Sequence, residues 1–259
     1  RLVGSEMCIR DRLGNTLTAI AREKAGIVRP QTPLITGELP EEARKEVARI
    51  ATEKGAPWTV ADPGSVQLNR DGLLEIDGIQ GTFQAPAIRG PGIRADLAIS
   101  IALYRAVLEK LDKPLDTIQL QSALKDLRLP ARIEVFPGPP TCCLDTAHTP
   151  ESIKSLRQTL EEIGFPQPRA LILSLSTDKR REEILAEAGG IADEIIFTRA
   201  DETRSVDPQE LRDTFGSGRI IEDPREALEF SRQKGWNPII TGSFYLAGAL
   251  RPCMRNESE

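Results

Sequence analysis

The sequence contains one histidine, four cysteines and no long apolar run. A single histidine excludes any metal site built from several imidazoles. Four cysteines in 259 residues provide no disulfide framework and indicate a reducing compartment, so we expect a cytoplasmic protein. No apolar segment approaches the roughly 18 residues that a membrane-spanning helix needs. We therefore do not expect a disulfide-stabilised protein, a metal site built from several histidines, or a membrane-spanning protein.

The sequence also has no excess of positive charge, because its 34 basic residues are outnumbered by 39 acidic ones and the net charge is −5. A nucleic-acid groove needs clustered positive charge, so no nucleic-acid partner is expected. The sequence lacks the CxxC, HExxH, GxSxG and EF-hand patterns. The GPG at 90–92 is not followed by GKS or GKT and is no P-loop. What remains is an ordinary globular composition, long enough for one large domain or two medium ones.

Residues 1–12, RLVGSEMCIRDR, differ in character from the rest. They lack the basic start and apolar stretch of a signal peptide. Residues 2–12 resemble an in-frame translation of a sequencing-library adapter, so we expect this stretch to be non-native and the natural protein to be cut there. The alternative is a natural N-terminal segment.

The first part of the chain, 13–128, mixes helices with short strands. Residues 14–28 have apolar positions at helical spacing, and residues 40–54 begin with Pro and acids and end with Lys and Gly. Residues 65–86 alternate apolar and polar side chains around two Asp-Gly turns, which predicts a β-meander. The other expected elements are strands at 33–36 and 57–60 and helices at 94–111 and about 115–127.

The second part, 129–259, alternates strands with helices from a boundary near Leu129-Pro130. Expected strands are 131–136, 141–145, 170–175, 194–199, 219–221 and 238–243. Expected helices are 150–163, about 180–189, about 207–214 and about 224–233. This alternation predicts an α/β fold with a mostly parallel, doubly wound sheet.

The strongest local signal is LDTAHTP at 144–150. A strand ends at Asp145, the only histidine is His148, and a helix capped by Thr149 follows. Ligands of open α/β sheets bind beyond the carboxyl ends of strands, near helix N-termini. Asp145 could accept a hydrogen bond from a hydroxyl or orient a cation, and His148 could contact phosphate or transfer protons. Alternatively, Asp145 caps the loop and His148 is an ordinary loop histidine.

Other candidate residues also have structural interpretations. Lys24 in REKAGI could be a solvated charge, and Arg132 could clamp an anion or form a structural ion pair. Asp178-Lys179 follow a predicted strand. TGSFYLAG at 241–248 could approach an anion, or its Gly242 could only permit a tight turn. The adjacent Cys142 and Cys143 point to opposite faces of a strand, so we expect them to fill the core.

Five segments together resemble the folylpolyglutamate synthase/dihydrofolate synthase family of the Mur ligase superfamily: LGNTLTAIAREKAGIVRP, LPARIEV, LDTAHTPES, LSTDK and ITGSFYLAG. The resemblance covers 13–251. It implies the end of a Mur ligase central domain at 13–128 and a Rossmann-like C-terminal domain at 129–259. It also implies an ATP-dependent amide ligase that adds L-glutamate to dihydropteroate or folates through an acyl phosphate. Its expected cofactors are ATP and Mg²⁺, and we expect a monomer.

The resemblance also implies residue roles. Lys24 matches a carbamylated lysine, and a carbamate could hold Mg²⁺ near the γ-phosphate. Arg132 matches an arginine that faces the nucleotide phosphates. Asp145 and His148 match a catalytic and nucleotide-binding block. Asp96 stands where the family has an asparagine that contacts adenine.

The sequence departs from the family pattern in three places. The family P-loop is missing, and Cys8-Ile9 stand where a metal-binding Asp-His pair is expected. The GxHQxxNA block reads GPGIRADL, with Gly92 and Ile93 in place of His and Gln. We therefore expect the chain by itself not to turn over ATP. Two alternatives remain open: another Mur-type ligase, such as a peptidoglycan-precursor enzyme, and a non-catalytic α/β binding module.

Overall fold

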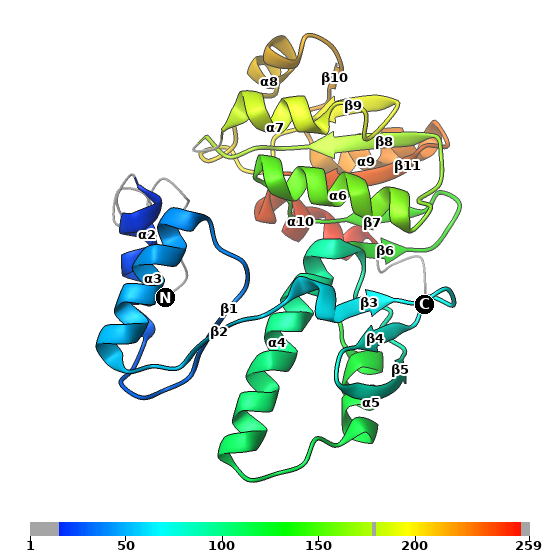
Figure 1. Cartoon of the computed structure of the whole chain (residues 1–259). Helices are drawn as coiled ribbons and strands as arrows, with labels where there is room; N and C mark the ends of the chain where they lie inside the picture. Colours follow the sequence, from blue (N-terminus) through cyan, green and yellow to red (C-terminus); the bar gives the residue numbers. More distant parts are fainter. Residues whose placement is uncertain (1–15, 178–179, 255–259) are drawn as a thin grey trace. The chain divides into compact units, whose positions relative to one another are not determined.

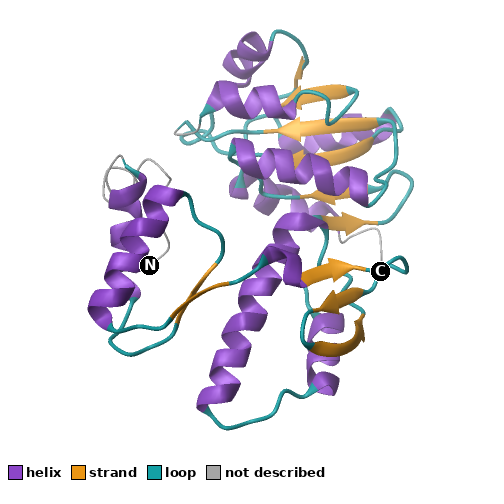
Figure 2. Ribbon diagram, in the orientation of Figure 1, coloured by secondary structure: helices purple, strands orange, loops and turns teal. Residues whose placement is uncertain are grey.

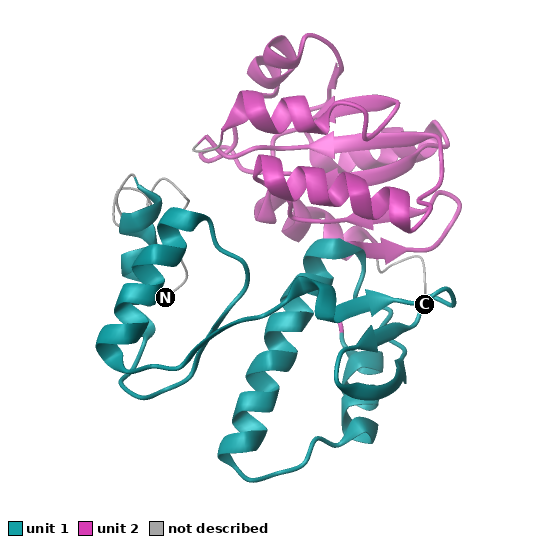
Figure 3. Cartoon of the chain, in the orientation of Figure 1, with its two compact units in different colours: residues 1–127 teal, residues 128–259 magenta. Residues whose placement is uncertain are grey.

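The computed structural model describes residues 16–177 and 180–254. The predicted adapter at 1–12, the Cys8-Ile9 departure and the candidate pair Asp178-Lys179 lie outside these residues. The chain divides into two compact units, residues 1–127 and 128–259, coloured separately in Figure 3. Each is described by itself. No described helix is long and apolar enough to cross a membrane.

The first unit begins with a helical pair beside a small parallel sheet. Helix α2 (Leu17–Lys24) continues into the 3-10 turn η1 (Ala25–Ile27), and α3 (Glu41–Lys54) packs against it through small and branched side chains such as Ala21 and Val47. Strands β1 (Leu34–Thr36) and β2 (Trp58–Val60) pair in parallel. Within the described residues, the helix predicted at 14–28 is an α-helix as far as Lys24, followed by a tighter 3-10 turn.

The rest of the first unit is a β-meander with two helices. Strands β3 (Val66–Leu68), β4 (Leu74–Ile76) and β5 (Ile79–Phe83) are antiparallel, as predicted for residues 65–86. Helices α4 (Gly90–Lys110) and α5 (Thr117–Asp126) follow. The prediction started α4 at residue 94 and was wrong by four residues, because Pro91 is tolerated in the first helical turn, whose amides have no intrahelical partner.

The second unit holds a six-stranded sheet in the order β10-β9-β8-β11-β7-β6 (Figures 1 and 2). All neighbours are parallel except β6 and β7, which confirms the predicted mostly parallel α/β fold. The strands are β6 (Glu134–Phe136), β7 (Cys142–Leu144), β8 (Arg169–Leu173), β9 (Glu194–Phe197), β10 (Arg219–Ile220) and β11 (Asn237–Thr241). The helices are α6 (Pro150–Glu162), α7 (Arg181–Ala188), α8 (Pro208–Phe215), α9 (Pro224–Gln233) and α10 (Phe244–Leu250), followed by η3 (Arg251–Met254).

Alternating strand side chains build a core on each face of this sheet. Cys143, Leu171 and Ile239 face one core with α6, α7 and α8, whereas Cys142 and Ile172 face the other core with α9 and α10. Figure 1 shows α6 and α7 over one face of the sheet and α9 and α10 over the other. The two cysteines are buried in different cores, which confirms their prediction as core residues.

Candidate functional site

Three parallel strands, β7, β8 and β11, lie side by side in the second unit and run in the same direction. The segments 145–149, 174–177 and 242–243 therefore leave the sheet at its carboxyl edge. This edge is the usual position of a ligand in open α/β sheets. The predicted residues Asp145, His148 and Arg132 all belong to this unit.

Asp145 is buried, with 6% of its surface exposed, and both carboxylate oxygens accept backbone hydrogen bonds. Oδ1 accepts from the Ala147 amide at 2.6 Å and Oδ2 from the Ile133 amide at 3.0 Å. Burial raises the pKa of the carboxyl group, and the amide donors and the nearby Arg132 charge oppose that shift. These contacts fit the interpretation of Asp145 as a loop cap, and its contact with a ligand stays a prediction.

His148 has one ring nitrogen in use. Its Nδ1 lies 2.7 Å from the carbonyl oxygen of Thr146, and a carbonyl can only accept, so Nδ1 carries the proton. In the neutral ring Nε2 is then an acceptor, which suits a ligand hydroxyl. Only a doubly protonated ring can donate from Nε2 to a phosphate. The following helix α6 is fixed by a capping box between Thr149 and Ser152.

Arg132 is exposed, and its guanidinium stacks on an aromatic ring. Its Cζ lies 5.5 Å from the ring centroid of Phe244, the first residue of α10. The same ring lies 5.4 Å from the His148 ring at 55°. Phe244 itself is 58% exposed. Arg132, Phe244 and His148 therefore form a cation–aromatic–imidazole cluster at the carboxyl edge, which we call the edge cluster.

The backbone around Arg132 is unusual. Ala131 has φ 54° and Ile133 has φ 48°, a left-handed conformation that costs about 1–3 kcal/mol at a residue with a side chain. The Ala131 amide donates to Glu134 Oε2 at 2.8 Å, and Glu134 forms a bidentate ion pair with Arg251. Such strain persists only where surrounding contacts hold it.

The turn after β11 explains the glycine in TGSFYLAG. Gly242 has φ +101°, and a Cβ there would lie 2.5 Å from the carbonyl oxygen of Ser174. This contact favours the tight-turn interpretation. Ser243 caps α10 by accepting from the Tyr245 amide at 3.1 Å. The sequence reasoning overlooked Phe244, although an aromatic residue that follows Gly-Ser at the end of a buried strand was a usable signal.

The structure places Lys24 and Asp96 in the first unit and not in the unit that holds the edge cluster. Lys24 is the exposed last residue of α2, and Asp96 is exposed on the second turn of α4. Among residues 16–177 and 180–254, no group of three or more His, Cys, Asp or Glu could hold a metal ion. The carbamate on Lys24 and its part in holding Mg²⁺ stay predictions.

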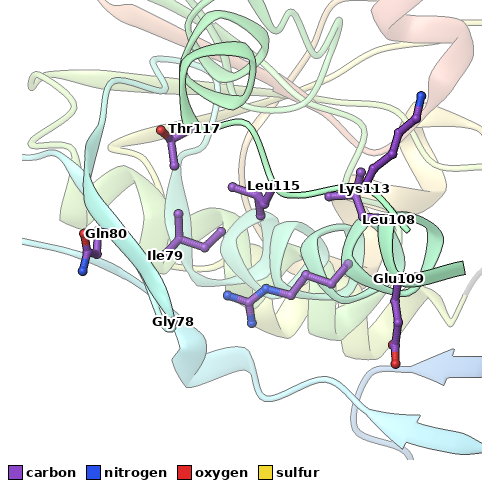
Figure 4. Close-up of a pocket in the computed structure, with 9 residues that line it drawn as sticks. Gly78, Ile79, Gln80, Leu108, Glu109, Lys113, Leu115 and Thr117 are labelled. Atoms are coloured by element: carbon purple, nitrogen blue, oxygen red, sulfur yellow. The ribbon is translucent and has the colours of Figure 1, made fainter. Parts of the chain in front are cut away.

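The first unit has a surface hollow of about 490 Å³ between α4, β5 and the segment before α5 (Figure 4). Its lining residues include Ile79, Arg105, Leu108 and Leu115. The Arg105 guanidinium donates to the carbonyl oxygen of Asp77 at 2.6 Å, so it already holds the β4–β5 turn. None of the predicted site residues lines this hollow.

Comparison with known proteins gives a family match within the second unit. Residues 131–239 match the family model of the Mur ligase, glutamate ligase domain. The second unit is therefore a Mur ligase C-terminal domain of the α/β class.

Two curated relatives define the family more narrowly. Folylpolyglutamate synthase of Lacticaseibacillus casei is 27% identical over 249 residues, and dihydrofolate synthase/folylpolyglutamate synthase of Bacillus subtilis is 27% identical over 253. Each alignment covers 92% of this chain and 58% of the relative. The chain is therefore similar over most of its length to members of the folylpolyglutamate synthase/dihydrofolate synthase family of the Mur ligase superfamily.

A solved structure shares the fold. Escherichia coli FolC in complex with DHPP and ADP superimposes with a TM-score of 0.80 at 22% identity, covering 96% of this chain and 59% of that one. The chain thus spans somewhat less than three-fifths of the length of the relatives that it matches.

Proposed function

We propose that this chain is part of an ATP-dependent ligase that joins L-glutamate to dihydropteroate or a folate through an acyl phosphate. The edge cluster carries the proposal, because it presents a cation, an aromatic face and an imidazole acceptor at one sheet edge. The unit that holds it matches a glutamate ligase domain, and the related E. coli structure contains ADP.

The donor set of the edge cluster fits an adenine nucleotide. An exposed guanidinium can pair with phosphate oxygens, and the aromatic face of Phe244 restricts the directions in which Arg132 points. Neutral His148 can accept from a ribose hydroxyl through Nε2. ATP supplies the phosphoryl group that activates the carboxylate for attack by the glutamate amine. Arg132 stabilises negative charge on the phosphates by geometry that is set before the reaction.

Lys24 enters the proposal only as a carbamate. That modification replaces an ammonium by a carboxylate-like group, which is the ligand type that Mg²⁺ prefers. Among the described residues no cluster of three or more His, Cys, Asp or Glu could hold a metal ion, and we derive no step through Mg²⁺. Four cysteines in 259 residues are too few for a disulfide framework and fit a reducing compartment, so we place the reaction in the cytoplasm.

The test is a ligation assay on the longest natural reading frame that contains this chain. The expected result is ADP release that requires both glutamate and a pteroate or folate acceptor. ADP release that requires a peptidoglycan precursor instead would favour another Mur-type ligase. No ADP release with either acceptor would favour the non-catalytic binding module. We expect the 259-residue chain alone to release no ADP.

A further inference from the structure

Arg132 lies between Ala131 and Ile133, which both have a left-handed backbone conformation. The backbone amide of each of these two residues donates to a carboxylate, and the two carboxylates belong to different residues. The Ala131 amide donates to Glu134 Oε2 at 2.8 Å, and the Ile133 amide donates to Asp145 Oδ2 at 3.0 Å. Alanine and isoleucine both prefer negative φ, and a β-branched residue at positive φ is a real outlier. Without these acceptors each residue would return to the preferred region and redirect the chain at Arg132.

Both carboxylates are themselves anchored in the body of the second unit. Arg251, from η3, donates through Nε to Glu134 Oε2 and through a terminal nitrogen to Oε1, each at 2.8 Å. Glu134 and Arg251 are only 22% and 26% exposed. Asp145 leaves β7 beside β11, and its second oxygen accepts from Ala147 at 2.6 Å. The segment 131–133 is therefore tied to two separate, partly or fully buried points.

We propose that Glu134, with Arg251 behind it, and Asp145 are positioning residues that hold Arg132 against Phe244 in the geometry that meets nucleotide phosphates. This proposal rests on the proposed function, in which Arg132 contacts those phosphates. Glu134 acts through the backbone of Ala131 and touches no ligand. Together, the two contacts set the direction of one guanidinium group, that of Arg132.

Four variants separate positioning from general stability. Glu134→Met removes the acceptor and the ion pair, and Glu134→Gln keeps a neutral acceptor. Ala131→Gly in the Glu134→Met background supplies a residue that adopts positive φ without strain. Glu194→Met is the matched control, because Glu194 is also a strand glutamate and its side chain is 29% exposed. It lies at the amino end of β9 and forms an ion pair with Arg219 at 3.6 Å.

Two readouts are measured on the 259-residue chain: ADP affinity by calorimetry and amide hydrogen exchange at Ala131 and Ile133. We expect Glu134→Met to speed exchange at Ala131 and to weaken ADP binding about tenfold or more, because a small misplacement of a binding group has large effects. Glu134→Gln should weaken binding about threefold, since a neutral acceptor is roughly half as strong. Adding Ala131→Gly should recover binding several-fold, and Glu194→Met should change neither readout.

The proposal would be overturned if Glu134→Met bound ADP with unchanged affinity although hydrogen exchange at Ala131 became faster. It would also be overturned if Glu134→Met and Glu194→Met lost equal ADP affinity. Failure of the glycine to restore any binding would also overturn it. If Glu134→Met does not fold, the milder Glu134→Gln and its Ala131→Gly double variant decide in the same way. Absence of ADP binding by the unsubstituted chain would count against the edge cluster as a nucleotide site, and the exchange at Ala131 then decides separately whether Glu134 holds the backbone.

Discussion

The two units differ in what their exposed apolar side chains signify. Of the large hydrophobic residues that are exposed in the described chain, eight lie in the first unit: Leu17, Ile27, Val60, Leu68, Leu103, Val107, Leu111 and Ile118. The second unit has two, Phe244 and Tyr245. Its sheet is covered on both faces, so an exposed aromatic residue stands out there and marks the edge cluster. In the first unit, with sheets of two and three strands, exposure is widespread and marks no particular site.

The largest expected effect is the loss of unfolding free energy when a buried leucine of the second unit is truncated, compared with an exposed leucine of the first unit. Leu171→Ala in β8 removes a side chain that is fully buried, which should cost about 2–5 kcal/mol of unfolding free energy. Leu103→Ala on α4 removes one that is 47% exposed and should stay within about 0.5 kcal/mol. Urea denaturation measures both. Similar losses of unfolding free energy in the two variants would contradict the expected difference between a buried core residue of the second unit and an exposed apolar residue of the first.

The next effect concerns two arginines that both stack on phenylalanine. Arg132 lies over Phe244 at the carboxyl edge, and Arg219 lies 4.8 Å from the Phe230 centroid at the start of β10, at the amino edge. Arg132→Met should weaken ADP binding by roughly 10- to 100-fold, because a hydrogen bond to a charged group is worth about 1.5–3 kcal/mol. Arg219→Met should leave ADP affinity unchanged. An equal loss in both variants would mean that stacking, and not the site, is what the nucleotide needs.

The smallest effect is an opposite response to acid in the two units. In the first unit, hydrogen bonds from Arg49 and then Arg22 lower the pKa of Glu46 to about 2. Its contribution to stability is complete above the usual value of 4.5 and is lost as the pH falls from there through about 2. In the second unit burial raises the pKa of Asp145 above its usual 3.8. The folded state therefore holds this proton more tightly, and stability falls as the pH rises from 3.8 through the raised value.

Unfolding free energy measured against pH tests these signs. Glu46→Gln should flatten the acid loss between about pH 4.5 and 2. Asp145→Asn should lower stability at every pH, because an amide nitrogen would face a backbone donor, but it should remove the decline above pH 3.8. A decline above pH 3.8 that persists in Asp145→Asn would assign it to another group.

The alternation of strands and helices made most of the second unit predictable from sequence. Thr149-Pro150, Asp207-Pro208 and Asp223-Pro224 each mark a helix start, and the structure begins α6, α8 and α9 at these prolines. Buried strands without internal polar residues were equally clear. The insertion of β11 between β8 and β7 had no local signal, because sheet order depends on packing between segments that are distant in sequence.

The candidate site was predicted less completely than the fold. Asp145 and His148 were found because they follow a strand that ends at a helix N-terminus. The left-handed backbone at Ala131 and Ile133 could not be foreseen, since neither residue type favours it and the contacts that hold it come from Glu134 and Asp145. That both oxygens of Asp145 accept from the backbone also depends on tertiary structure.

The most direct test of the account is ADP titration of the isotopically labelled 259-residue chain, followed residue by residue by NMR. The account predicts chemical-shift changes concentrated at residues 131–133, 145–149 and 242–245 and none around Arg219. Changes centred on the hollow in Figure 4, or no change at millimolar ADP, would contradict the assignment of the edge cluster as the nucleotide site.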